Sequence, residues 1–250
     1  MKKNIFLSIF IFFILCSEIA SAQDTLHSRF GIVFGMVSNI HSANFNTLPG
    51  IPDGTSIFSS GNGSGFAFSL LYEYPLNDFL LIGGRLGIMD HSATLSSSAE
   101  QTTLFVNGEK KTGDFTRSLD VVGSSFGIEP RINIRIIKGL LVSAGIHIGF
   151  PLSLKFIQRD TASIGTFADT SGKDSKRGTR NQHAGDLPNA ASVLLHGIIS
   201  LGYEFPLNKK HTTFLVPEIT YTPAFNDLVK GLTWKTNAII YAIALKFSID

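Results

Sequence analysis

Apolar side chains occupy every second position from Leu140 to Phe156, and most positions between hold small or polar residues, among them Ser143, His147 and Lys155. Because successive side chains of a β-strand point to opposite faces, this segment predicts one strand with an apolar face and a polar face. Strands of globular sheets usually have about five or six residues, so this one is unusually long. A long strand that is apolar outside and polar inside is typical of a membrane-spanning β-barrel.

Further segments repeat the alternation and bring the predicted number of strands to eight. The expected strands are residues 29–38, 65–74, 79–90, 119–137, 140–156, 192–205, 211–222 and 232–249. Their connections alternate between tight turns (75–78, 138–139, 206–210) and longer polar segments (39–64, 91–118, 157–191, 224–231). We therefore expect an all-β fold, an eight-stranded antiparallel up-and-down transmembrane β-barrel with short periplasmic turns, long extracellular loops and both termini in the periplasm. Within the second long segment, Asn107-Gly108 predicts a hairpin that extends the barrel as a ribbon.

The first residues predict export. Lys2 and Lys3 precede an apolar run at 5–15, and Ala20-Ser21-Ala22 is a typical cleavage signal. This pattern predicts a secretory signal peptide at 1–22 and a barrel domain at 23–250. Cys16 is the only cysteine, so a mature chain that lacks it has no disulfide and no thiol chemistry. The net charge of +2 gives no indication of a nucleic-acid partner.

Charged side chains recur on the polar faces of the predicted strands. With one histidine they form a predicted lumen-lining polar network: Arg29, Glu73, Arg85, Glu129, Arg131, Arg135, His147, Lys155, Glu204, Glu218 and Lys246. An eight-stranded barrel is just wide enough for side chains to fill it. Charges of both signs in that space are expected to pair, because an unpaired charge away from water is costly. A polar core that plugs the barrel is the favoured interpretation, and a gated or narrow pore for small solutes is the alternative.

Catalytic, metal and cofactor sites are not expected. His147 and Ser143 share the inward face of one strand, and Glu129 lies on its neighbour. Residues four apart on a strand are separated by about 13 Å, which is too far for the hydrogen bond of a catalytic pair. The histidines show no metal-ligand spacing, and the glycine-rich segment 61–65 is interpreted as a flexible loop, since it does not join a strand to a helix. A non-enzyme is expected, with a lipid-modifying barrel enzyme as a remote alternative.

Basic residues gather in the third long segment, at Lys173, Lys176, Arg177 and Arg180. They form a possible surface ligand patch that would contact lipopolysaccharide phosphates. Because glycine, serine, threonine and aspartate dominate the segment, a solvated loop is the favoured interpretation.

Several features together resemble the small outer-membrane β-barrel (porin-like) domain proteins of Gram-negative bacteria. They are the predicted signal peptide, the eight alternating strands, the stretch Val216-Pro217-Glu218-Ile219-Thr220-Tyr221, Trp234, and the closing strand with Ala244-Leu245-Lys246-Phe247. The resemblance implies location in the outer membrane, contact with outer-membrane lipids and lipopolysaccharide, and insertion by the barrel-assembly machinery. Together with the residue patterns above, it leads us to expect a non-catalytic structural or surface-interaction role, no cofactor, no nucleic-acid partner and an extracellular ligand of unknown identity.

Overall fold

The computed structural model describes residues 27–51, 56–137 and 139–249, so the predicted signal peptide at 1–22 lies outside the described residues. No helix long and apolar enough to cross a membrane occurs in these three ranges. The described chain is built mainly from strands. They are β1 (Ser28–Phe45), β2 (Phe58–Pro75), β3 (Leu80–Asp90), β4 (Ala93–Ser97), β5 (Glu100–Val106), β6 (Glu109–Ile137), β7 (Leu140–Ala162), β8 (Thr166–Phe167), β9 (Thr179–Asp186), β10 (Leu194–Tyr203), β11 (Phe205–Pro206), β12 (Thr213–Thr222) and β13 (Thr233–Ile249).

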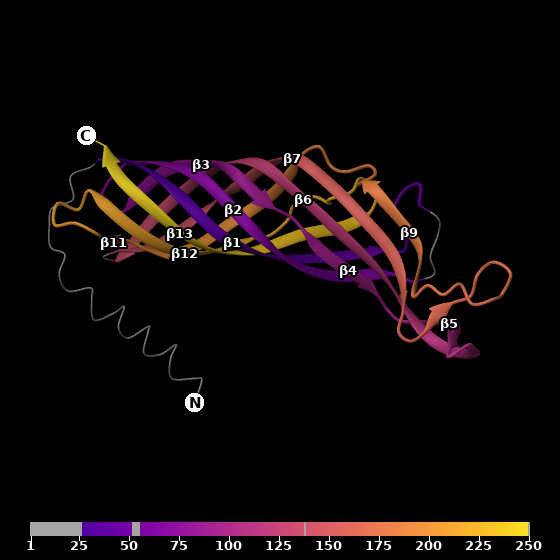
Figure 1. The fold of residues 1–250 in the computed structure, drawn as a ribbon. Coiled ribbons are helices and arrows are strands. Elements are labelled where there is room, and N and C mark those ends of the chain that lie inside the picture. Colours follow the sequence, from indigo (N-terminus) through magenta and orange to yellow (C-terminus); the bar gives the residue numbers. More distant parts are fainter. Residues whose placement is uncertain (1–26, 52–55, 138, 250) are drawn as a thin grey trace, which may run out of the picture.

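Eight of these strands close a ring in which every pair of neighbours is antiparallel. The order around the ring is β1, β2, β3, β6, β7, β10, β12 and β13, and β13 pairs with β1 to complete it. Figure 1 shows these strands running up and down the barrel. Ser28 lies opposite Ile249 in the closing pair, so both ends of the described chain lie at the end with the short turns. The predicted all-β fold is confirmed, and the eight strands of the ring are antiparallel and run up and down as expected.

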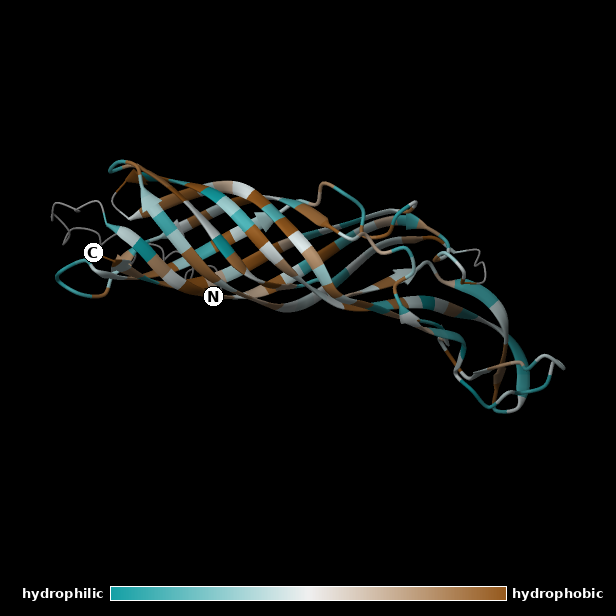
Figure 2. Cartoon of the chain, turned by 90° about the horizontal axis from the view of Figure 1, so that it is seen from above, coloured by the Kyte–Doolittle hydropathy of each residue, from teal (hydrophilic) through white to brown (hydrophobic). Residues whose placement is uncertain are grey.

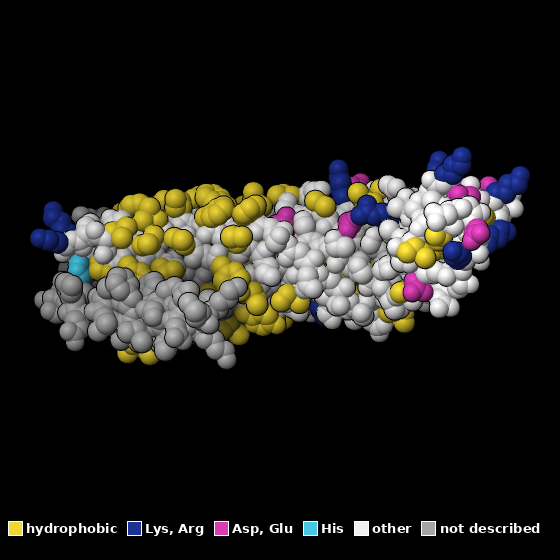
Figure 3. Space-filling model, turned by 60° about the horizontal axis from the view of Figure 1, so that its bottom comes forward, with side chains coloured by type: hydrophobic (Ala, Val, Ile, Leu, Met, Phe, Trp, Pro, Cys, Tyr) yellow, Lys and Arg dark blue, Asp and Glu magenta, His cyan; other side chains and the backbone are white. Residues whose placement is uncertain are grey.

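The ring strands sort their side chains between the interior and the exterior. In β1, Val33 and Val37 are buried, whereas Phe34 and Met36 are 55% and 59% exposed. Figure 2 shows apolar and polar residues alternating along the strands, and Figure 3 shows apolar side chains spread over the barrel. We call this exposed apolar exterior the apolar belt. It includes Phe34, Met36, Phe66, Leu86, Ile132, Ile146, Ile199, Leu201, Ile219, Tyr241 and Ile243.

The alternation of β7 changes face near Pro151. Ser125 of β6 pairs with Pro151 and Ser124 pairs with Ser153, which leaves Leu152 unpaired as a β-bulge. A bulge adds one residue to one strand, so side chains beyond it point to the opposite face of the sheet.

Beyond the bulge, Leu154 and Phe156 are buried and Lys155 is exposed. The prediction that Lys155 lines the lumen is therefore wrong, as is the outward placement of Leu154 and Phe156. The residue types continue their alternation without interruption, and only the pairing with β6 reveals the extra residue. Past the bulge, β7 also exchanges its neighbour β10 for β9.

The ring strands continue past their predicted ends on the side away from the short turns. Residues 39–45 extend β1 and residues 58–64 begin β2, so most of the predicted loop 39–64 is paired strand. The glycine-rich segment 61–65 belongs to β2, and its interpretation as a flexible loop is wrong. A Cβ atom at Gly63 would overlap the carbonyl oxygen of Ser92. Glycine is thus required here because another backbone approaches closely.

Strands β5, β8 and β9 join the far ends of β6 and β7 in a sheet that projects beyond the ring, at the right of Figure 1. We call residues 100–118 and 158–186 the lobe. Asn107 and Gly108 have φ angles of 55° and 84° and form the predicted hairpin turn between β5 and β6. Leu104, Phe115 and Phe167 are buried together in a small apolar core. The second and third long segments therefore contain a folded part of the chain.

Candidate functional site

The interior next to the short turns holds a cluster of buried ion pairs. Arg29 donates to the Glu204 carboxylate at 2.7 Å, and Arg135 reaches the same carboxylate at 3.3 Å. The Lys246 ammonium lies 2.8 Å from both carboxylate oxygens of Glu73 and 3.2 Å from Glu204. These residues come from β1, β2, β6, β13 and the short β10–β11 connection, so the contacts tie different walls of the ring together.

A second ion cluster lies further along the interior. The Arg85 guanidinium makes two contacts with the Glu218 carboxylate, at 3.0 and 2.7 Å. Arg131 donates to Glu218 at 3.1 Å and to Glu129 at 3.0 and 2.6 Å. The Thr220 hydroxyl donates to Glu218 at 2.7 Å. Each buried carboxylate here thus has a guanidinium partner, as a desolvated charge requires.

Histidines lie next to the second ion cluster, on its side toward the lobe. His147 Nδ1 is 3.0 Å from the Glu129 carboxylate, and His91 Nε2 is 2.8 Å from the Ser125 hydroxyl. The His196 ring lies 5.7 Å from the ring of His91 and 5.7 Å from that of His147, measured between centroids. A cavity of about 20 Å³, enough for one water molecule, lies beside His147 and Glu129.

Another histidine connects this layer to an apolar region. The Trp234 indole N–H donates to His41 Nδ1 at 3.1 Å, and Trp234 is fully buried. Within the described residues, the second ring nitrogen of the other three buried histidines has no hydrogen-bond partner: His91 Nδ1, His147 Nε2 and His196 Nδ1. We call the four side chains the histidine layer.

The interior on the side of the histidine layer toward the lobe is filled by apolar side chains. We call this cluster the apolar plug. It comprises Ala43, Phe45, Leu48, Phe58, Leu95, Leu119, Val121, Leu154, Phe156, Leu187, Ala191, Leu194, Leu228, Val229 and Trp234. Leu154 and Phe156 enter it only because the bulge at Leu152 turns them inward. Ion clusters, histidines and plug therefore follow one another through the barrel.

The contacts of His147 decide whether a catalytic triad could form in the interior. The Glu129–His147 pair has the acid–imidazole arrangement that orients a general base. No serine of the described ranges is hydrogen-bonded to His147, since its Nε2 has no partner among them and the Ser125 hydroxyl is bonded to His91. His147 is 2% exposed and Ser125 is fully buried, so a substrate outside the barrel does not reach them. Among the described residues, no group of three or more His, Cys, Asp or Glu is arranged to hold a metal ion.

Nearly all of the predicted lumen residues lie inside the ring, and Lys155 is the exception. Those inside are Arg29, Glu73, Arg85, Glu129, Arg131, Arg135, His147, Glu204, Glu218 and Lys246. Sequence reasoning did not find His41 and His91, because the predicted strands end at residues 38 and 90. Continuing the alternation of the first strand from Val33 and Val37 would have placed His41 inside.

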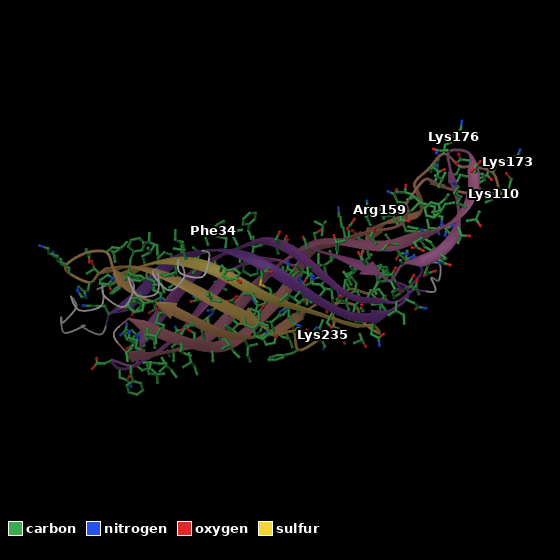
Figure 4. All side chains as sticks on the ribbon, turned by 90° about the horizontal axis from the view of Figure 1, so that it is seen from below. Phe34, Lys110, Arg159, Lys173, Lys176 and Lys235 are labelled. Carbon is green, nitrogen blue, oxygen red and sulfur yellow. The ribbon has the colours of Figure 1, made fainter. Side chains whose placement is uncertain are left out.

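The predicted basic patch is divided in the structure. Lys173, Lys176 and Arg177 are exposed, and Figure 4 shows the two lysines with Lys110 at the tip of the lobe. Arg180 instead lies 4.3 Å above the Phe167 ring and 3.5 Å from the Asp160 carboxylate, where it supports the lobe core.

Acidic side chains are interleaved with the exposed lysines. A hydrogen bond from Ser171 lowers the pKa of the Asp169 carboxyl, and one from Thr166 lowers the pKa of the Asp174 carboxyl. Because both carboxylates remain charged, they offset the neighbouring lysines. The tip of the lobe is therefore a mixed-charge surface.

The chain matches no protein-family model and no curated protein sequence. It is similar to the solved structure of Ail, the attachment invasion locus protein of Yersinia pestis, with 10% identity over 88% of this chain and 99% of the other and a TM-score of 0.38. It is similar to the outer membrane protein OprG from Pseudomonas aeruginosa, with 9% identity over 92% and 100% of the two chains and a TM-score of 0.40. It is also similar to the outer membrane protease OmpT from Escherichia coli, with 9% identity over 93% of this chain and 100% of the other and a TM-score of 0.40. At these values no activity carries over, and the barrel assignment follows from the strand pairings.

Proposed function

We propose that this protein is an integral barrel of the bacterial outer membrane with a structural or surface-interaction role and no catalysis. The apolar belt is the observation that carries the proposal, because large exposed apolar surfaces mark membrane or protein contacts. A closed ring leaves no strand edge unpaired within the lipid, which is the condition for crossing a bilayer with strands. The short turns and both termini then face the periplasm, and the lobe faces outward. Lipids, lipopolysaccharide and the barrel-assembly machinery are the expected partners.

Cysteine labelling tests the orientation. Single cysteines replace Lys173 in the lobe and Lys209 in a short turn, in a background that lacks Cys16. A membrane-impermeant maleimide added to intact cells is expected to label position 173 and to label position 209 only after the outer membrane is permeabilised. Equal labelling of both positions in intact cells, or the reverse order, contradicts the proposal.

A narrow porin is the alternative function, and the filled interior supports a closed barrel instead. The plug contains Trp234, Leu95 and Leu119, all fully buried, and the charges beneath it are paired with one another. Purified folded protein in a planar bilayer is expected to give no conductance steps. Stable, reproducible steps from the wild-type protein would favour the porin. Trp234→Ala, which removes the largest plug side chain, is the comparison variant in which steps are expected to appear.

A further inference from the structure

A groove lies on the outside of the barrel at the end of the apolar belt that is nearer the lobe. Its volume is about 480 Å³, and it lies between residues 191–195 and residues 226–231. Val193 and Leu195 supply apolar lining that is at least partly exposed, and Asn226, Asp227 and Lys230 supply polar lining. Two further lining residues, Ala191 and Val229, are buried members of the apolar plug, so the groove lies against the outer side of that cluster.

Hydrogen bonds hold the two walls of the groove in place. The Asn226 amide donates to the Val193 carbonyl at 2.8 Å, and its side-chain oxygen accepts from the Leu195 N–H at 2.7 Å. On the other side, the Lys230 N–H donates to the Asn189 carbonyl at 2.9 Å. The groove is therefore preformed, which lowers the entropic cost of binding a ligand.

The groove continues a lipid-facing stripe. Leu195, Ile199 and Leu201 lie on the outward face of β10 and are 36%, 59% and 52% exposed. Phe225, on the adjoining β12–β13 connection, is 59% exposed. An apolar chain lying along this stripe in the membrane would lead directly to the groove.

The charged groups at the groove favour an anion. Asp227 already has partners, since its carboxylate accepts from the backbone N–H of Trp234 at 3.0 Å and lies 3.6 Å from the Lys235 ammonium. Lys230 is exposed and forms no ion pair with any residue of the described ranges. Figure 4 places Lys235 well away from the labelled lysines of the lobe tip. The groove thus has an apolar floor and a cation at its rim.

We propose that this groove binds one phosphate-bearing lipid of the outer leaflet, with an acyl chain along Leu195 and Ile199 and the phosphate at Lys230. The inference builds on the proposed membrane location and adds a defined lipid site. An apolar floor next to a cation matches an amphiphile better than a free anion, because a free phosphate would leave the floor without a partner.

Native mass spectrometry of the whole folded protein tests the site. The protein is released from bilayers of phosphatidylcholine that contain a minor fraction of phosphatidylglycerol, and retained lipids are counted. One retained phosphatidylglycerol is expected. Retention should weaken about tenfold in Lys230→Ala, the loss expected for one charge-assisted contact. It should persist in Lys230→Arg and in Lys209→Ala, a control at the opposite end. Val193→Trp, which fills the groove, should also abolish retention.

The other outcomes are equally decisive. Equal retention of phosphatidylcholine and phosphatidylglycerol, or unchanged retention in both Lys230→Ala and Val193→Trp, overturns the lipid site. Displacement of the lipid by equimolar inorganic phosphate also overturns it, because the groove would then be a simple anion site. A folded barrel that enters bilayers without retaining a lipid refutes this inference alone, whereas folded protein that does not enter bilayers refutes the proposed function as well.

Discussion

The guanidinium of Arg85 meets the carboxylate of Glu218 across the barrel interior through two contacts, although 133 residues separate them in the chain. Arg85 lies on β3 and Glu218 on β12, and these strands are not neighbours in the ring. The pair therefore connects opposite walls. Both side chains are less than a tenth exposed, so neither charge has water as an alternative partner.

Glu218→Ala is expected to destabilise the folded barrel by about 3–5 kcal/mol, because it leaves Arg85 and Arg131 without their shared carboxylate. Urea unfolding in detergent or lipid vesicles measures this. Glu109→Ala is the control, since Glu109 forms an exposed pair with Lys111 whose loss should cost at most about 1 kcal/mol. Similar effects of the two substitutions would mean that water reaches Glu218 and that the interior is open.

The apolar belt predicts the cost of a charge on the barrel exterior. Ile146→Arg should destabilise the protein in lipid by about 2–4 kcal/mol, because the side chain would lie in the hydrocarbon region. Ile164, in the lobe, is exposed to a similar degree, at 51% against 47% for Ile146. Ile164→Arg should change the stability by less than about 0.5 kcal/mol. Equal effects of the two substitutions would be inconsistent with the proposed membrane position.

The bulge at Leu152 predicts which side chains of β7 are accessible to water. In a background without Cys16, Lys155→Cys should react rapidly with a water-soluble maleimide, and Leu154→Cys should react slowly. The reason is that Leu154 is 7% exposed and lies in the apolar plug, whereas Lys155 is exposed. Faster reaction at position 154 would mean that β7 keeps one alternation throughout and has no bulge.

The close approach at Gly63 predicts a backbone cost for any side chain. Gly63→Ala should lower the free energy of unfolding by about 1–3 kcal/mol, because its Cβ would displace the segment at Ser92. Gly185→Ala in β9 is the matched control, as its Cβ would come no nearer than 4.0 Å to Phe156. That change should stay within about 0.5 kcal/mol. A neutral Gly63→Ala would show that residues 61–65 are the loop inferred from sequence.

The eight ring strands and the Asn107-Gly108 hairpin were predictable because their signals are local. A period of two needs only a few residues to show which face is apolar, and a turn depends on the conformations its own residues adopt. The inward charges followed from the same alternation. The extra length of the strands was not predictable in this way, since glycine and serine in residues 58–65 carry no apolar alternation.

The sequence alone determined that this chain alternates as eight strands with charges on one face, because each strand shows its own period. The tertiary structure alone decided which charges meet, where the histidine layer forms and which residues fill the plug. Arg85 contacts Glu218, and the His196 ring stacks on the His91 ring, only because ring closure brings distant strands around the same interior. Leu152 becomes a bulge only through its pairing with β6. These contacts join residues far apart in the chain, and no local pattern of residues specifies them.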